Sequence, residues 1–201
     1  KNRKLKIGFM SGDFYEHPVG YFIPNTLTNL SKDNFKLYGY YNNQISDNQT
    51  LVVKDSFDIF KNINSFSDEQ KFDLIQEDGI DILFDLSGHT ARNSLTVFRK
   101  KAAPIQISWL GYCFTTGLSS MDYIICDDFV LPKKDEKWFT EKPIRMSNSY
   151  YCFSLPKNRL IKIEKRQENI DNFVFGCFSN APKITDDVMS LWSEILKKTE
   201  N

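Results

Sequence analysis

The stretch Lys4-Leu5-Lys6-Ile7-Gly8-Phe9-Met10, followed by Ser11-Gly12-Asp13, predicts a β-strand that ends in a loop. Polar and apolar residues alternate along it, which is the pattern of a strand, and a serine, a glycine and an aspartate in a row are typical of a turn. Residues 19–30 then carry apolar side chains at helical spacing, and we expect Pro24 in the first turn of this helix. The chain therefore opens with a strand followed by a helix.

Strands and helices alternate along the rest of the chain. Apolar runs predict further strands at residues 35–41, 80–86, 104–110, 121–126 and 173–178. Helices are predicted at residues 67–79, where Ser67 and Gln70 form a capping box and Gly79 suits the C-terminal cap, at about 92–101, and from Thr185 onward. This alternation favours the α/β class, with a parallel sheet that has helices on both faces.

A charged, weakly apolar stretch divides the chain. We interpret residues 157–171 as a linker between a first unit, residues 1–156, and a second unit, residues 172–201. One strand and one helix cannot bury a sheet, so we expect this chain to be part of a longer protein.

The composition excludes several classes of partner. The 201 residues include 26 Lys and Arg against 26 Asp and Glu, a balance without the positive field that attracts nucleic acid. No apolar run reaches the ~20 residues that span a bilayer, and we expect no membrane partner. The four cysteines form no Cys-x-x-Cys pair and have no histidine at ligand spacing, which argues against a metal site and for a reducing, cytoplasmic compartment.

The chain has two histidines, and each stands in a loop that follows a predicted strand. His17 lies in Ser11-Gly12-Asp13-Phe14-Tyr15-Glu16-His17-Pro18, and His89 lies in Asp85-Leu86-Ser87-Gly88-His89-Thr90. Ligands of open α/β sheets bind outside the carboxyl ends of the strands, so the two loops predict one shared site. The alternative is that each is a loop histidine bound by backbone or solvent.

Two further loops carry candidate residues. Residues 111–117 follow a predicted strand and include two hydroxyls and aromatic side chains, although an ordinary turn is the alternative. Lys183 stands just before a helix N-terminus, where it is a candidate partner for a phosphate; a solvated turn lysine is the alternative. No Gly-x-Gly-x-x-Gly or Walker pattern is present, so a dinucleotide or P-loop site is not supported.

Five segments together resemble the catalytic region of O-linked N-acetylglucosamine transferases and their SPINDLY-like relatives. They occur in the family's order and cover nearly the whole chain: residues 5–22, residues 78–90, Ala103-Pro104-Ile105-Gln106, Trp109-Leu110-Gly111-Tyr112 with Met121-Asp122-Tyr123, and Phe178-Ser179-Asn180-Ala181-Pro182-Lys183-Ile184. The resemblance implies a GT-B architecture of two Rossmann-like lobes. Residues 1–156 would form the N-terminal lobe, and residues 172–201 would start the C-terminal, nucleotide-binding lobe.

The resemblance also implies an activity, the transfer of a sugar to Ser or Thr hydroxyls of a protein acceptor. The implied donor is a nucleotide sugar, UDP-GlcNAc, and no metal or other cofactor is expected. The implied catalytic residues are His17, His89 and Lys183, of which Lys183 would stabilise the departing diphosphate. The implied substrate-binding residues are Asp13, Thr90, Gly111, Tyr112 and Asn180. Full-length relatives add a helical-repeat region and the rest of the C-terminal lobe.

Two departures from the family pattern leave alternatives open. Cys113-Phe114-Thr115-Thr116-Gly117 stands where the family commonly has Pro-Gly-Thr-Ser-Gly. Most of the C-terminal lobe is absent, so we expect the chain alone to be inactive. One alternative is a related transferase that uses another donor, fucose or a hexose, or an Asn acceptor. The other is a Rossmann-like binding module without catalysis.

Overall fold

The computed structural model describes residues 3–153 and 174–199. These residues belong to two compact units, Lys1–Arg159 and Leu160–Asn201. The predicted linker, residues 157–171, lies outside the described residues.

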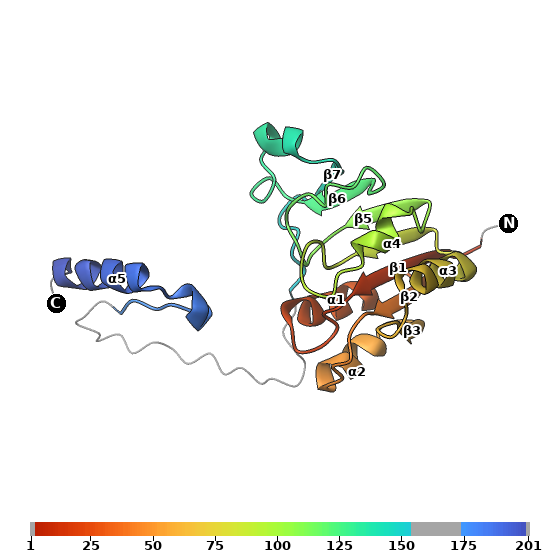
Figure 1. The fold of residues 1–201 in the computed structure, drawn as a ribbon, viewed down its shortest axis with the longest axis horizontal. Helices are drawn as coiled ribbons and strands as arrows, with labels where there is room; N and C mark the ends of the chain where they lie inside the picture. The colour runs from red at the N-terminus through yellow and green to blue at the C-terminus, as the bar shows by residue number, and fades with distance from the viewer. Residues whose placement is uncertain (1–2, 154–173, 200–201) are drawn as a thin grey trace. The chain divides into compact units, whose positions relative to one another are not determined.

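The first unit is built on a seven-stranded sheet in which all neighbouring strands are parallel (Figure 1). The order of the strands across the sheet is β3-β2-β1-β4-β5-β6-β7. Their bounds are β1 Leu5–Ser11, β2 Phe35–Tyr41, β3 Ile59–Asn62, β4 Ile82–Asp85, β5 Ile105–Ser108, β6 Tyr123–Cys126 and β7 Lys142–Arg145. The predicted α/β class with a parallel, Rossmann-like sheet is therefore confirmed.

The sequence does not predict the two edge strands, β3 and β7. Each has four residues, and neither shows the polar and apolar alternation of a half-buried strand. β7 also contains Pro143, which has no N–H to donate and is tolerated where one side of a strand is unpaired. A short 3-10 helix, Lys133–Trp138, precedes β7 and is likewise missing from the prediction.

Helices cover both faces of the sheet (Figure 1). They are α1 Pro18–Thr28, α2 Asn48–Lys54, α3 Asp68–Asp78 and α4 Leu95–Arg99. On one face, Ile7 of β1 and Ile23 of α1 belong to one apolar cluster, to which α2 also contributes. On the other face, Leu83 of β4 packs in a second cluster with Ile75 of α3 and Phe98 of α4. The sheet is therefore buried on both sides, as parallel sheets usually are.

Local sequence signals set the ends of α3, as predicted. Ser67 Oγ accepts a hydrogen bond from the backbone N–H of Gln70 at 3.2 Å, and Gln70 Oε1 accepts one from the N–H of Ser67 at 2.8 Å. Gly79 then ends the helix at its C-terminal cap. Because these signals act within one turn, sequence alone is enough to place both ends.

The predicted position of Pro24 is wrong. α1 begins at Pro18, so Pro18 occupies the first turn and Pro24 lies inside the helix. Pro24 has no N–H to offer the carbonyl of Gly20, and Gln49 Nε2 donates to that oxygen at 2.7 Å instead. A side chain of α2 therefore replaces the missing helical hydrogen bond.

The second unit contains, in its described residues, a 3-10 turn at Ala181–Lys183 and the helix α5, Asp186–Lys198. α5 begins as predicted, because Thr185 Oγ1 accepts a hydrogen bond from the N–H of Val188 at 3.4 Å. The predicted strand at 173–178 is wrong for residues 174–178, which have no regular secondary structure. A strand needs a hydrogen-bonded neighbour, and the described part of this unit provides none.

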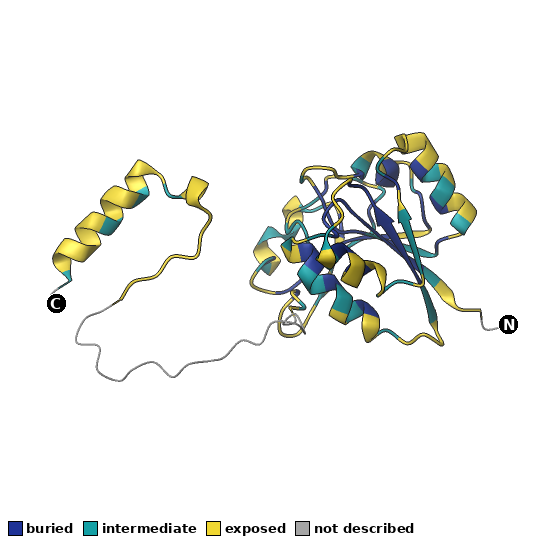
Figure 2. Cartoon of the chain, turned by 90° about the horizontal axis from the view of Figure 1, so that it is seen from below, coloured by how far each residue is buried: buried dark blue, intermediate teal, exposed yellow. Residues whose placement is uncertain are grey.

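Most apolar residues in the described part of the second unit are exposed. No residue of α5 is buried within the described chain (Figure 2). The large exposed apolar residues of this unit are Val174, Phe175, Phe178, Met189, Leu191, Ile195 and Leu196. None of the helices in residues 3–153 and 174–199 is long and apolar enough to cross a membrane.

Candidate functional site

The candidate site lies where the strand order reverses. From β1 the chain adds β2 and β3 on one side, and then returns to add β4 to β7 on the other side of β1. The carboxyl ends of β1 and β4 therefore form a topological switch point, which is where open α/β sheets bind ligands. The loop that carries His17 follows β1, and the loop that carries His89 follows β4. The backbone N–H of Gly12 donates to Ser87 Oγ at 3.3 Å, so the two loops touch.

Asp13 is one of the buried acidic residues of this edge. Its backbone N–H donates to Ser11 Oγ at 2.9 Å; the residue is 8% exposed, and its carboxylate accepts no hydrogen bond from any described residue. Burial raises the pKa of Asp13, and the positive charges of His17 and Arg92 oppose that rise. A buried carboxylate without a donor costs free energy until a ligand supplies one. Asp13 therefore stays a substrate-binding candidate.

His17 is both a loop residue and the N-terminal cap of α1. Its Nδ1 accepts a hydrogen bond from the backbone N–H of Val19 at 3.3 Å. Its ring lies 5.6 Å from the ring of Tyr15, centroid to centroid, and the side chain is half-buried. The local structure of α1 thus holds the imidazole in place at the end of β1.

The loop after β4 is organised by Asp85. This carboxylate is 1% exposed and accepts hydrogen bonds from the backbone N–H groups of Ser87 at 3.0 Å and Gly88 at 2.9 Å. Burial raises the pKa of Asp85 to about 6, although these hydrogen bonds lower it. Gly88 has a φ of +54° and no room for a Cβ, because the side chain of Tyr112 occupies that space. Only a glycine fits this turn.

His89 follows this turn and is exposed. Its Nε2 lies 2.9 Å from the carbonyl oxygen of Thr116, and its ring packs edge-on against Tyr112 at 5.5 Å. Thr90, predicted to bind substrate, donates its hydroxyl to the carbonyl of Ser87 at 2.8 Å. Within the described residues, the hydroxyl of Thr90 therefore supports the loop.

The loop after β5 completes the edge. A Cβ at Gly111 would overlap the carbonyl oxygen of Leu86, so the loop can approach the end of β4 only with a glycine at this position. Tyr112 covers Gly88, and the exposed ring of Phe114 packs edge-on against Tyr112 at 5.8 Å. Gly111 and Tyr112 thus lie beside His89, where the sequence predicts substrate contacts.

Several residues of this edge are missed by the sequence prediction. Asn43 Nδ2 donates to the carbonyl of Gly12 at 2.7 Å, and Asn42 Nδ2 donates to the carbonyl of Arg92 at 2.9 Å. Arg92 has a left-handed backbone with a φ of 57°, which this hydrogen bond helps to hold. Glu141 is 3% exposed and binds the loop after β5. Two asparagines directly after a strand are a signal that could have been found, whereas nothing near Glu141 in sequence indicates its partner.

Lys183 and Asn180 belong to the second unit. Both are exposed, and the N–H of Lys183 donates to the carbonyl of Asn180 at 2.9 Å. The histidines belong to the first unit, so the roles of Lys183 and Asn180 stay predictions.

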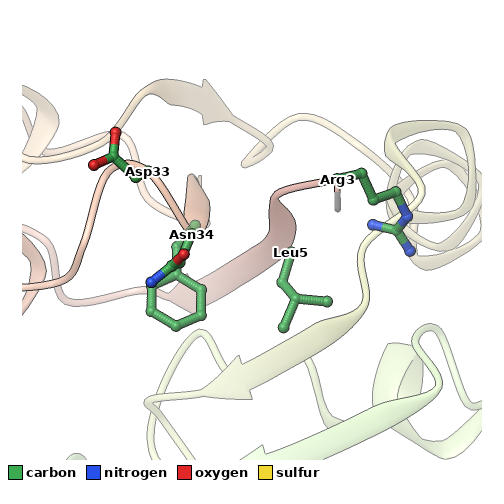
Figure 3. A pocket seen from close by; sticks show the side chains of 5 residues that line it. Arg3, Leu5, Asp33 and Asn34 are labelled. Atoms are coloured by element: carbon green, nitrogen blue, oxygen red, sulfur yellow. The ribbon is translucent and has the colours of Figure 1, made fainter. Parts of the chain in front are cut away.

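One shallow pocket lies at the other edge of the sheet. Its volume is about 340 Å³, and it is lined by Arg3, Leu5, Asp33, Asn34 and Phe35, at the amino ends of β1 and β2 (Figure 3). Arg3 is already paired with Asp81 there, through two hydrogen bonds of 2.6 Å. This pocket lies at the amino ends of the strands, whereas the switch point lies at their carboxyl ends. Its lining residues include no pair of side chains that could act together as acid and base. In the described parts of the chain, no three His, Cys, Asp or Glu side chains are placed to hold a metal ion.

The edge of the sheet at the carboxyl ends of β1, β4 and β5, called the carboxyl edge below, is chemically suited to act on a hydroxyl group. It presents two imidazoles, the side chain that most often serves as a general acid or base, and one buried carboxylate without a donor in the described chain. Backbone N–H and carbonyl groups of the three loops are held by buried side chains, so these groups are fixed before a ligand arrives.

Comparisons with known proteins agree on one group of enzymes. The profile of glycosyl transferase family 41 matches residues 1–167. A protein of Oryza sativa subsp. japonica named probable UDP-N-acetylglucosamine–peptide N-acetylglucosaminyltransferase SPINDLY is 34% identical over 205 residues; the match covers 100% of this chain and 22% of that protein. Its namesake from Arabidopsis thaliana is 32% identical, with 99% and 22% covered. The chain therefore spans about a fifth of these relatives.

A solved structure is similar as well. A mutant of the O-GlcNAc transferase of Thermobaculum terrenum has a TM-score of 0.86 and 32% sequence identity to this chain. The match covers 98% of this chain and 37% of that structure.

Proposed function

The chain belongs to glycosyl transferase family 41, and from that premise we propose that it forms the N-terminal lobe of a catalytic region that transfers a sugar to protein hydroxyls. The observation that carries the proposal is the meeting of the His17 and His89 loops at the switch point of a parallel sheet. Since the chain spans only 22% of its curated relatives, the activity is proposed for the longer protein in which such a lobe works. Residues 174–199 would belong to the second, nucleotide-binding lobe.

The proposed donor is UDP-N-acetylglucosamine, and the proposed acceptor is a Ser or Thr hydroxyl of a peptide. The names of the relatives support this donor and a peptide acceptor. The acceptor hydroxyl would lie at the carboxyl edge, among Asp13, His17 and His89. Lys183 would neutralise the charge that develops on the diphosphate as the glycosidic bond breaks, because a leaving anion needs a positive partner.

Transfer assays with the full-length protein test the proposal. Radiolabelled UDP-GlcNAc, a nucleotide-activated fucose and a nucleotide-activated hexose are each supplied with a library of Ser-, Thr- and Asn-containing peptides. Transfer from UDP-GlcNAc to Ser or Thr is the expected result. Transfer from another donor only, or to Asn only, would show that the family is right and the substrates are wrong.

Two substitutions test the proposed roles. Lys183→Ala should lower kcat on the order of 100-fold with little change in donor KM, because its interaction strengthens only in the transition state. The control is Lys197→Ala, which removes an exposed lysine near the other end of the same unit. His17→Ala should slow transfer while leaving donor affinity nearly unchanged. A raised donor KM with normal kcat in Lys183→Ala would assign this lysine to ground-state binding.

Binding by the chain alone tests the division between lobes. Calorimetry with UDP or UDP-GlcNAc should give a Kd no tighter than about millimolar, since the main nucleotide contacts are proposed to lie in the other lobe. Micromolar affinity would place the donor site on the sheet described above.

A further inference from the structure

The two histidines use their ring nitrogens differently. His17 Nδ1 accepts the backbone N–H of Val19, so in the neutral ring the proton is on Nε2. The lone pair of Nδ1 is then engaged in the hydrogen bond from Val19, and Nε2 carries the ring proton. A neutral His17 in this state donates a hydrogen bond and has no lone pair free to take a proton.

His89 differs in that its neutral ring keeps a free lone pair. Its Nε2 faces the carbonyl oxygen of Thr116 at 2.9 Å, and a carbonyl oxygen only accepts hydrogen bonds. Nε2 must therefore carry the proton, and Nδ1 of the neutral ring keeps its lone pair. No described residue donates to this Nδ1, and the side chain is exposed.

Glu141 holds the partner of His89 in place. Its carboxylate accepts hydrogen bonds from the backbone N–H of Thr116 at 2.7 Å, from the Thr116 hydroxyl, and from the Thr115 hydroxyl at 2.7 Å. Three donors to the carboxylate of Glu141, a residue that is 3% exposed, fix the backbone N–H and the side chain of Thr116. The carbonyl of Thr116 is thereby kept facing the imidazole of His89.

We propose that His89, and not His17, is the histidine that accepts the proton of the acceptor hydroxyl, and that Glu141 is the positioning residue that holds its ring through Thr116. The proposal rests on the proposed glycosyl transfer. In the step, a lone pair of the hydroxyl oxygen forms the bond to the anomeric carbon, and the hydroxyl proton passes to His89 Nδ1. The bond from the anomeric carbon to the phosphate oxygen breaks, and its electron pair leaves with the nucleoside diphosphate. His17 would then position a substrate oxygen by donating from Nε2.

The state of each ring can be measured without any substrate. Diethyl pyrocarbonate acylates an imidazole nitrogen that has a free lone pair, and the chain has two histidines, so mass spectrometry distinguishes them. His89 should react about tenfold faster than His17, whose lone pair is engaged. Two-bond proton–nitrogen NMR spectra should show a proton on Nε2 and none on Nδ1 of His89. Faster acylation of His17, or a proton on Nδ1 of His89, would overturn the proposal.

The role of Glu141 needs a control for simple loss of stability. Asp127 is a suitable control because it is 5% exposed, accepts three backbone N–H groups, and contacts neither His89 nor Thr116. In Glu141→Ala the NMR signals of His89 should show a mixture of the two neutral tautomers, whereas Asp127→Asn should leave them unchanged. Equal changes in both variants would show that Glu141 acts on stability alone.

Kinetics of the full-length protein complete the test. His89→Gln should lower kcat on the order of 100-fold with donor KM unchanged. Glu141→Ala should lower kcat by about tenfold, and Glu141→Gln should restore most of it, because its amide oxygen still accepts from Thr116. If His89→Gln kept normal turnover while Asp13→Asn abolished it, the buried carboxylate would be the proton acceptor and the proposal would fail. Failure to transfer any sugar would overturn the proposed function, whereas the ring states would still be decided by acylation and NMR.

Discussion

Phe98, in α4 of the first unit, is fully buried, whereas Phe178 in the second unit is fully exposed. The same contrast separates two helices that begin in the same way. α3 and α5 each have a side-chain cap and two acidic residues in the first turn, but Ile75 of α3 is buried and no residue of α5 is. Local signals are therefore enough to start a helix. Burial requires a second surface, which the sheet provides in the first unit.

The largest difference between the two units is expected from removing one aromatic ring in each. Phe98→Ala should lower the free energy of unfolding by about 3–5 kcal/mol, since it leaves a cavity in the core. Phe178→Ala should change it by less than about 0.5 kcal/mol, since the ring is exposed. Urea unfolding followed by far-UV circular dichroism measures both. A similar loss in both variants would mean that Phe178 is covered in solution.

The two units also differ in the burial of acidic side chains. Asp85 is buried, and its folded-state pKa of about 6 lies above its usual value of 3.8. Between these two pH values the folded protein holds a proton that the unfolded chain releases, so stability falls as the pH rises through this window. Relative to Asp85→Asn, the wild-type protein should lose about 2 kcal/mol between pH 4 and 6. The nearby charges are those of His89, which lowers the pKa of Asp85, and Glu141, which raises it.

Urea unfolding at a series of pH values measures this difference. In the described part of the second unit the acidic residues are Asp186, Asp187 and Glu194, and all three are exposed, so we assign this effect to the first unit. A difference between the two proteins that is constant across the window would contradict the burial of Asp85.

Removing the N-terminal side-chain cap of one helix in each unit compares the same local interaction in both units. Ser67→Ala should lower the free energy of unfolding of the first unit by about 1 kcal/mol, the usual cost of a lost N-terminal cap. Thr185→Ala should lower the helix content seen by circular dichroism, because α5 has no buried face to support it, and should leave the unfolding midpoint of the first unit unchanged. If Thr185→Ala lowered that midpoint, the two units would be coupled.

The smallest effect is expected from polar substitutions on the exposed face of α5. Leu191→Ser and Leu196→Ser together should shift the Tm of the first unit by less than about 2 °C. Light scattering should show weaker self-association, because exposed apolar area is removed. The matched substitution Leu83→Ser in the core should prevent stable folding. A large fall in Tm for the α5 variant would show that its apolar face is buried.

Sequence alone was sufficient where the signal is local or periodic. The strands at β1, β2, β4, β5 and β6 and both ends of α3 follow from apolar runs and caps. α2 was missed although Asp47 and Thr50 form a capping box there, because the apolar residues that follow lie next to one another and show no helical spacing. The wrong strand at 174–178 has the right residues but no neighbour to pair with.

The candidate site was predictable only in part. The order of the elements brings the loops of His17 and His89 to one edge, and that order can be inferred from the sequence. The residues that hold these loops cannot be found in this way. Glu141 binds Thr116 across 25 positions of sequence, and Asn42 binds Arg92 across 50. Such contacts depend on how the chain folds back on itself, which no local pattern encodes.

The backbone of the carboxyl edge is held by side chains from other elements. Asn43 holds Gly12, and Glu141 holds Thr116, while the rings of Tyr112 and Phe114 form no hydrogen bonds in the described chain. In evolutionary terms, mutations of the residues that hold the backbone, Asn43 and Glu141, and mutations of the rings on the surface of the edge can occur independently. Phe114 is exposed and takes no part in these hydrogen bonds, so a substitution there would alter the surface of the edge without removing the bonds that hold its backbone.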